Sequence, residues 1–173
     1  MNIEENIFAL AIEKATRKTA EKLFQETGES FYYFTLITTG EAHSPFVSAS
    51  SVEFLEATPV EQREYIKWSY ADSPYCGYGA EYFSEVDDLF SERPDFLELS
   101  ESMQAEEFNL RINAMVSAIS RLDKEGVFGK GKDRENILVN VEVMPPDHTN
   151  VERAIKLNPA SALVEWLKEA AEE

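Results

Sequence analysis

The feature that most constrains the fold is the nine-residue run at positions 31–39, Phe-Tyr-Tyr-Phe-Thr-Leu-Ile-Thr-Thr. Nearly every residue in this run is aromatic or β-branched, and these residue types favour β-strands. Successive side chains of a strand point to opposite faces, and apolar side chains occupy both sets of positions here. Neither face can be left in water, so the run predicts a central strand that other elements cover on both sides.

Two long segments have apolar residues at steps of three and four, the spacing that places them on one face of a helix. In the first segment, at 2–25, these residues are Phe8, Ile12, Ala15, Thr19 and Leu23. In the second segment they are Phe108, Ile112, Met115, Ile119 and Leu122, and Gly126 marks the end of the helix. Shorter helices are predicted at 58–67, at 80–91 and from Pro159 onward.

Two further segments predict strands, a short one at 46–50 and a longer one at 137–143. In the longer one, isoleucine and valine alternate with Asn140 and Glu142, which is the pattern of a strand with one face in water. The order helix, strand, strand, helices, strand, helix indicates an α+β fold. We expect one domain over residues 1–173, with a small, mainly antiparallel sheet of about three or more strands packed by N-terminal, central and C-terminal helices.

The composition narrows the classes of function. The chain has 33 acidic and 16 basic residues and a formal charge of −17, which argues against a nucleic-acid-binding protein because phosphate contacts need clustered Lys and Arg. No segment approaches the roughly 20 apolar residues that span a bilayer. The single cysteine, Cys76, argues for a reducing compartment. We therefore expect a cytoplasmic protein with no membrane or nucleic-acid partner, while the oligomeric state stays open.

The chemical motifs in the sequence are incomplete. Residues 126–133 fit the phosphate loop G-x-x-x-x-G-K, except that Asp133 replaces the Ser or Thr that holds magnesium. The loop also follows a predicted helix and precedes a strand, the reverse of the phosphate-loop order. The two histidines, His43 and His148, have no metal-ligand spacing. We therefore predict no catalytic residue, metal or cofactor, and hence no enzyme, and leave open whether the loop at Gly126–Arg134 binds an anion.

Negative charge is concentrated in the middle of the chain. Residues 41–107 contain 16 acidic and three basic side chains, a net charge of −13. Four of these acidic residues have the spacing of one stripe along a helix: Glu81, Glu85, Asp88 and Glu92. Such a stripe is either an ordinary solvated surface or an electrostatic landing site for a basic protein.

The segment Trp68–Gly79 is a predicted loop that carries one Trp and three Tyr residues. Large amphipathic rings in a loop either cover the core or form a binding surface, because Trp and Tyr are frequent at binding hot spots. Both alternatives stay open. Asp72 precedes Pro74 by two residues, which favours a role in forming a turn.

The same loop resembles part of a known family. Its residues Trp68-Ser69-x-Ala71-Asp72-x-Pro74-Tyr75 resemble a motif of the bacterial domain-of-unknown-function family DUF4303. Three further segments resemble that family: Phe31-Tyr32-Tyr33-Phe34 through Thr39-Gly40-Glu41, Leu122-Asp123-x-Glu125-Gly126-x-Phe128-Gly129, and Leu157-Asn158-Pro159. The resemblance implies a small bacterial cytosolic protein and brings no established activity or site residues. Some members are similar in size and acidity to the immunity proteins of polymorphic-toxin systems, which is an analogy.

These features favour a non-enzymatic protein-binding module, with an immunity protein that neutralises a basic toxin as its most concrete form. In this hypothesis Trp68, Tyr75 and Tyr78 anchor the partner. The charges that steer the partner are those of Glu81, Glu85, Asp88 and Glu92. The alternative is a small-molecule-binding protein or an enzyme with a pocket under the loop at Trp68–Tyr78 and Asp72 as a polar anchor. A pocket there with a carboxylate of strongly raised pKa would favour this alternative, and a flat acidic face would count against it.

Overall fold

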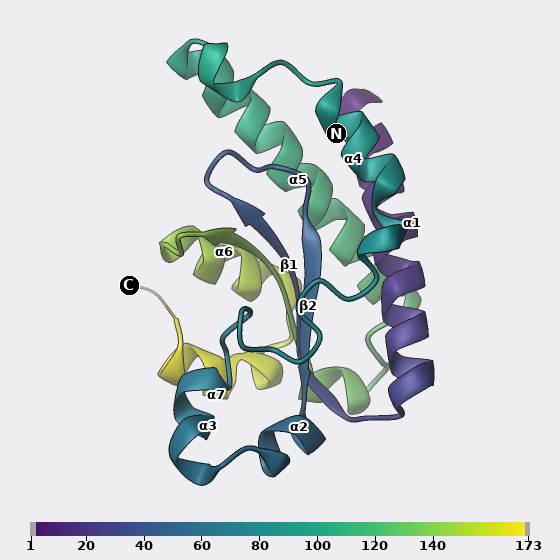
Figure 1. Ribbon diagram of the computed structural model, residues 1–173, viewed down its shortest axis with the longest axis vertical. Helices are drawn as coiled ribbons and strands as arrows, with labels where there is room; N and C mark the ends of the chain where they lie inside the picture. The colour runs from purple at the N-terminus through teal and green to yellow at the C-terminus, as the bar shows by residue number, and fades with distance from the viewer. Residues whose placement is uncertain (1–2, 172–173) are drawn as a thin grey trace.

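The computed structural model describes residues 3–171 and places a three-stranded sheet at the centre of that part of the chain (Figure 1). β1 (Phe31–Thr39) is the middle strand, as the sequence predicts. It pairs antiparallel with β2 (Phe46–Ser51) and parallel with β3 (Leu138–Met144). The sheet is therefore mixed rather than mainly antiparallel, because a short turn joins β1 to β2 whereas β3 follows a long helical crossover.

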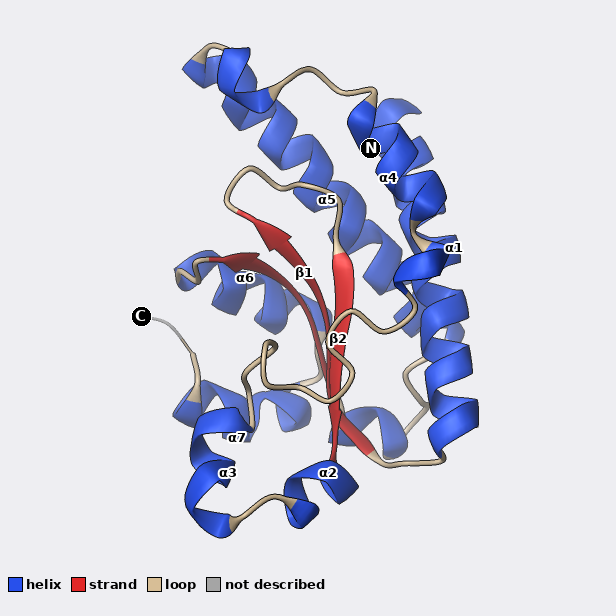
Figure 2. Cartoon of the chain, viewed as in Figure 1, coloured by secondary structure: helices blue, strands red, loops and turns tan. Residues whose placement is uncertain are grey.

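Two long helices, α1 (Ile3–Thr27) and α5 (Glu101–Glu125), cover one face of the sheet, and α4 (Ser84–Ser91) packs on α1 (Figure 2). This layer is the main hydrophobic core. Apolar side chains from α1, β1, α5 and β3 fill it: Ile12, Leu23, Phe34, Leu36, Met115, Ile119, Val139 and Val141. The two predicted apolar helix faces are thus confirmed. No helix within residues 3–171 combines the length and apolar character that crossing a membrane requires.

Two shorter helices, α6 (His148–Leu157) and α7 (Ala160–Glu169), cover the other face of the sheet. The cluster between them and the sheet is smaller and consists of Tyr33, Leu138, Ala154, Leu163 and Trp166. α2 (Val52–Ala57) and α3 (Val60–Ile66) follow β2 and lead into the aromatic loop. Helices therefore lie on both faces of a small sheet, which confirms the predicted α+β class.

Sequence analysis predicts a single helix in the last part of the chain and misses α6. Helical spacing is present on the buried face of α6, at Asn150, Arg153, Ala154 and Leu157, but two of these four side chains are polar. The apolar stripe on which helix prediction depends is therefore interrupted.

Polar side chains from this region satisfy the free edge of β3. Asn150 pairs with both backbone groups of Val143: its Oδ1 accepts from the N–H at 2.8 Å, and its Nδ2 donates to the carbonyl oxygen at 3.1 Å. Asn158, just after α6, makes the same two bonds with Val139, at 2.8 and 2.6 Å. These side chains close an edge that would otherwise be open to pairing with another strand.

Smaller differences concern the helix starts. The predicted helix at 80–91 is divided into a 3₁₀ turn (Ala80–Tyr82) and α4, so Glu81 lies in the turn rather than on α4. α5 begins before its apolar pattern does, at Glu101. Asn2, where the first predicted helix begins, lies outside the described residues.

Candidate functional site

One face of the sheet carries polar side chains although it is buried. Strand pairing places these residues, here called the polar sheet face, on the side of α6 and α7: Tyr33, Thr35, Ser48, Ser50, Asn140 and Glu142. The most exposed of them is Glu142, at 7%. The prediction that 137–143 forms a strand with one face in water is therefore wrong, because helices cover both faces of the sheet.

Glu142 is the carboxylic acid on this face. Its Oε1 accepts a hydrogen bond from the Tyr33 hydroxyl at 2.9 Å. Removal from water raises the pKa of Glu142 from 4.5 to about 7, an effect that outweighs the hydrogen bond from Tyr33 and the positive charge of Arg153. Burial, together with Glu142 itself, raises the pKa of Tyr33 well above 10, so Tyr33 remains a donor.

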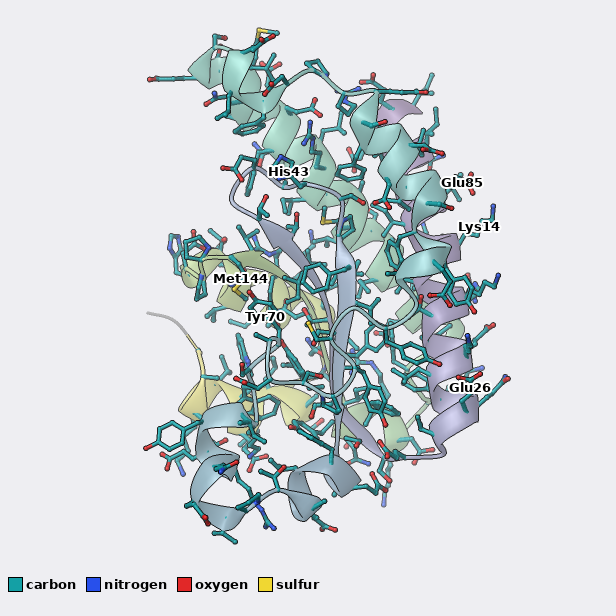
Figure 3. The ribbon with its side chains drawn as sticks, viewed as in Figure 1. Lys14, Glu26, His43, Tyr70, Glu85 and Met144 are labelled. Carbon is teal, nitrogen blue, oxygen red and sulfur yellow. The ribbon has the colours of Figure 1, made fainter. Side chains whose placement is uncertain are left out.

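A pocket of about 290 Å³ has Glu142 in its lining and is here called the Glu142 pocket. Its lining comes from the aromatic loop, the end of β3, α6 and α7: Trp68, Ser69, Tyr70, Glu142, Met144, Pro146, Asn150, Trp166 and Ala170. Figure 3 shows Tyr70, from the loop, near Met144, at the end of β3. Both tryptophans of the sequence line this pocket.

Contacts on several sides fix the Trp68 ring at the wall of the pocket. It packs edge-to-face on Tyr32 and Tyr33, with ring centroids 5.3 and 6.0 Å away. Its Nε1 donates to Glu169 of α7 at 2.9 Å. Lys67 Nζ lies 5.1 Å from the ring centroid and is ion-paired with the same Glu169 at 2.9 Å. The ring is thus tied to both the sheet and α7, which holds the loop over the pocket.

Arg153 of α6 lies near Glu142 but uses its N–H groups elsewhere. Its Nε donates to the Val141 carbonyl oxygen at 2.6 Å, Nη1 donates to Thr149 Oγ1 at 3.0 Å, and Nη2 donates to Asn150 Oδ1. Burial lowers its pKa. Arg153 therefore supports the edge of β3 and the position of Asn150 rather than forming an ion pair with Glu142.

Asn140 adds an unsatisfied acceptor to the polar sheet face. Its Nδ2 donates to the Asn150 carbonyl oxygen at 3.3 Å. Within residues 3–171, its Oδ1 is buried and accepts no hydrogen bond. A buried acceptor without a donor costs free energy, so this position favours a bound water.

The predicted aromatic anchors do not form one surface. Trp68 lines the Glu142 pocket, whereas Tyr75 and Tyr78 pack against the main core on the side of α1. Their hydroxyls donate to Glu29, at 2.6 Å, and to Glu26. The loop therefore covers parts of both hydrophobic clusters. Its rings are half-buried.

Asp72 lies at the surface and accepts a hydrogen bond from the Ser69 hydroxyl at 2.7 Å. The Asp72 backbone N–H in turn donates to Ser69 Oγ at 3.3 Å. These are the contacts of a turn, in agreement with the role that its position before Pro74 favours. Ser69 itself lines the pocket, so this turn helps to position one wall.

The acidic residues predicted to steer a partner are exposed, but they lie on the other side of the sheet from the Glu142 pocket. Glu85 is ion-paired with Lys14 of α1 at 2.6 Å, as Figure 3 shows, and Glu81 is paired with Lys22 at 3.6 Å. The remaining two, on or beside α4, are Asp88 and Glu92. Lysines of α1 therefore pair with Glu81 and Glu85, two of these four carboxylates.

The other motifs of the sequence have structural explanations. The loop at Gly126–Arg134 connects α5 to β3, and Gly126 and Gly129 adopt positive φ angles of 85° and 99°. Arg134 donates to the carbonyl oxygens of Ile137 and Leu157 at 2.7 and 2.9 Å, so its guanidinium is used internally. In the described part of the chain, no group of three His, Cys, Asp or Glu side chains could hold a metal ion.

Of the residues at this site, Trp68 was predicted from the sequence. The residues that the sequence patterns did not indicate are Glu142, Tyr33, Asn150 and Trp166. A signal for Glu142 was present. Because the strand at 31–39 needs cover on both faces, a strand beside it lies under the same cover, and its polar positions are then buried. The alternation at 137–143 was instead interpreted as a face in water.

Comparisons with known proteins place the chain in a family without assigning it an activity. No curated protein and no solved structure matches the chain. The family model described as "Domain of unknown function (DUF4303)" matches residues 12–159, a segment that includes the whole sheet and the aromatic loop. Trp166 and Ala170 of the pocket lie beyond the matched residues. Because the match extends over most of the sequence and agrees with the resemblance of its motifs, the chain belongs to the DUF4303 family.

Proposed function

We propose that this protein binds a small molecule in the Glu142 pocket. The observation that carries the proposal is a buried carboxyl, held by the Tyr33 hydroxyl, that lines a pocket between the aromatic loop and two helices. Removing a carboxyl from water is unfavourable, and a structural layer gains more from an apolar side chain at such a position. A perturbed acid that faces a pocket is therefore typical of a binding site.

The shape and lining of the pocket also suit a small ligand. Its volume of about 290 Å³ is near the lower end of the range for ligand sites, which begins at about 300 Å³. Rings and apolar side chains form most of the walls, and a few polar groups supply orientation, as in known ligand pockets. This proposal develops the small-molecule alternative of the sequence analysis.

Binding of a basic protein by the acidic residues stays a prediction. The surface on which this prediction was based is not continuous, because Trp68 packs with the cluster of α6 and α7, whereas α4 packs on α1 on the other side of the sheet. Its test is separate: substitution of all four acidic residues would have to weaken capture of a partner in a salt-dependent manner.

The two tryptophans offer a direct test of the pocket, because each provides one indole N–H signal in the NMR spectrum of ¹⁵N-labelled protein. A collection of small molecules with positive, negative and no charge is added in turn. We expect at least one compound to shift both indole signals in a saturable manner, since Trp68 and Trp166 line the same pocket.

Ala170→Phe is the matched variant, because the added ring occupies the pocket, and Glu85→Gln is the control on the other side of the sheet. Thermal unfolding confirms that both variants are folded. The shifts should be lost in Ala170→Phe and kept in Glu85→Gln. If no compound moves both signals, or if Ala170→Phe responds like the wild type, the proposal is rejected.

A further inference from the structure

We propose that the Glu142 pocket binds a small organic cation, an ammonium or guanidinium group carried on an apolar body. This inference rests on the proposed function and specifies the ligand class. Two properties of the lining carry the inference: the sign of its ionisable groups and the chemistry of its walls. A third observation, the way in which the neighbouring cations are used, argues against an anionic ligand.

The ionisable group of the lining is acidic. Among the described residues that line the pocket, Glu142 is the only carboxylic acid, and none is Lys, Arg or His. A buried carboxylate is unfavourable alone and is stabilised by an opposite charge that also donates hydrogen bonds to it. A cationic ligand would supply that charge, so the pocket is complementary to an ammonium or guanidinium group.

The walls are suited to the same ligand. Trp68, Tyr70 and Trp166 line the pocket, and cations bind favourably over aromatic faces, most strongly over Trp. The molecule already contains such a contact, because Lys67 Nζ lies 5.1 Å from the Trp68 ring centroid and is ion-paired with Glu165 and Glu169 at 2.6 and 2.9 Å. Aromatic rings beside a carboxylate thus hold an ammonium group next to the pocket.

The nearby cations leave little for an anionic ligand to bind. Arg153 donates to Val141, Thr149 and Asn150, and Lys67 is held by its two glutamates. The ionisable group that the lining offers to a ligand is therefore the Glu142 carboxyl, which favours a donor-bearing cation over a carboxylate or phosphate.

Three compounds that share one ring and differ in charge test the inference: benzylamine, which is cationic at neutral pH, benzyl alcohol and benzoate. Their affinities are measured from the two indole signals and from tryptophan fluorescence. We expect benzylamine to bind at least about ten-fold more tightly than benzyl alcohol. Benzoate is expected to produce no saturable shift.

The matched variant is Glu142→Gln, which keeps the shape of the side chain and removes its charge. It should weaken benzylamine about ten-fold and change benzyl alcohol by less than about two-fold. Thermal unfolding verifies its fold. Tyr33→Phe leaves the carboxyl in place but raises its pKa, so it should lose part of the preference for the cation at neutral pH and regain it at higher pH. It serves as a second variant if Glu142→Gln fails to fold.

The outcomes separate the ligand class from the pocket itself. If benzyl alcohol or benzoate binds as tightly as benzylamine or more tightly, with shifts at both tryptophans, the inference of a cationic ligand is overturned and the proposed pocket stands. Unchanged benzylamine affinity in Glu142→Gln would also overturn the inference of a cationic ligand. Absence of binding by all three compounds rejects the inference, and the wider collection described above then decides whether the pocket binds other molecules.

Discussion

The two faces of the central sheet differ in chemistry, and adjacent residues of β1 show the difference most directly. Phe34 and Tyr33 are both fully buried and point to opposite sides. Phe34 contacts only the main core, where its ring centroid lies 5.1 Å from that of Phe128 and 6.1 Å from that of Phe24. Tyr33 presents a hydroxyl to the carboxyl of Glu142 at 2.9 Å.

β3 repeats this contrast along its length. Its valines enter the main core, and their burial stabilises the fold by roughly 1.5–3 kcal/mol for each side chain. On the other face the same strand buries Asn140, whose Oδ1 lacks a hydrogen-bond partner within residues 3–171, and Glu142, whose pKa is raised. One face therefore provides stability, while the other retains unfavourable groups beside a pocket, which is where a binding function is expected.

The largest expected effect comes from the apolar face. Phe34→Ala removes a fully buried ring and leaves a cavity between α1, α5 and the sheet, so we expect the free energy of unfolding to fall by about 3–5 kcal/mol. Urea denaturation measures the change. A loss below about 1 kcal/mol would show that this face does not carry the stability assigned to it.

On the polar face, Glu142→Gln is expected to stabilise the protein, and the gain should depend on pH. In the unfolded chain Glu142 has its ordinary pKa of 4.5, and in the folded chain its pKa is about 7. Between these values the unfolded state releases a proton that the folded state keeps, so stability falls as the pH rises through this window and is constant above it. The full difference amounts to about 3 kcal/mol.

Gln has no proton to lose and can still accept from Tyr33. We therefore expect Glu142→Gln to exceed the wild type in free energy of unfolding by up to about 3 kcal/mol at pH 8 and by about 1 kcal/mol or less at pH 5. Because the two proteins are compared at the same pH, the contributions of the other carboxylates to the free energy of unfolding cancel. An equal difference at both pH values would mean that Glu142 titrates normally and that the two faces are less different than proposed.

Tyr33→Phe sharpens the comparison further, because it removes one hydroxyl and keeps the ring. The lost hydrogen bond is to a group that is charged at pH 8, so we expect destabilisation of about 2 kcal/mol there and less at pH 5, where Glu142 is protonated. The pKa of Glu142 should rise further, since the Tyr33 hydroxyl favours its ionised form. NMR titration of the side-chain carboxyl carbon measures this shift, and a fall in the pKa would contradict the assigned contact.

The main core could be predicted from the sequence because its signals are local and apolar. The run at 31–39 and the helical spacing in α1 and α5 each indicate an element and the face that it buries. The polar side of the fold lacks such local apolar signals. Asn150 and Arg153 interrupt the apolar stripe of α6, and Glu142 in an alternating strand looks the same whether its face meets water or a pocket.

The site itself depends on contacts between distant parts of the chain. Tyr33 and Glu142 are 109 residues apart and meet because β1 and β3 pair in parallel, a register that the sequence does not specify. Trp68 was identified from its loop, whereas the other tryptophan of the lining, Trp166, lies on the last predicted helix and was not identified. Single residues of the pocket were therefore visible in the sequence, whereas their arrangement was not.

An exposed carboxylate provides the smallest expected effect and the clearest contrast with Glu142. Glu85 pairs with Lys14 at the surface, where the two side chains are 59% and 75% exposed. Water and salt screen such a pair, so Glu85→Gln should change the free energy of unfolding by less than about 0.5 kcal/mol, and the change should vanish in about 1 M salt. Urea denaturation at low and high salt measures it. If Glu85→Gln instead altered stability as much as Glu142→Gln does, the location of a carboxyl in this fold would not determine its energetic effect, and the contrast between buried and exposed acids would fail.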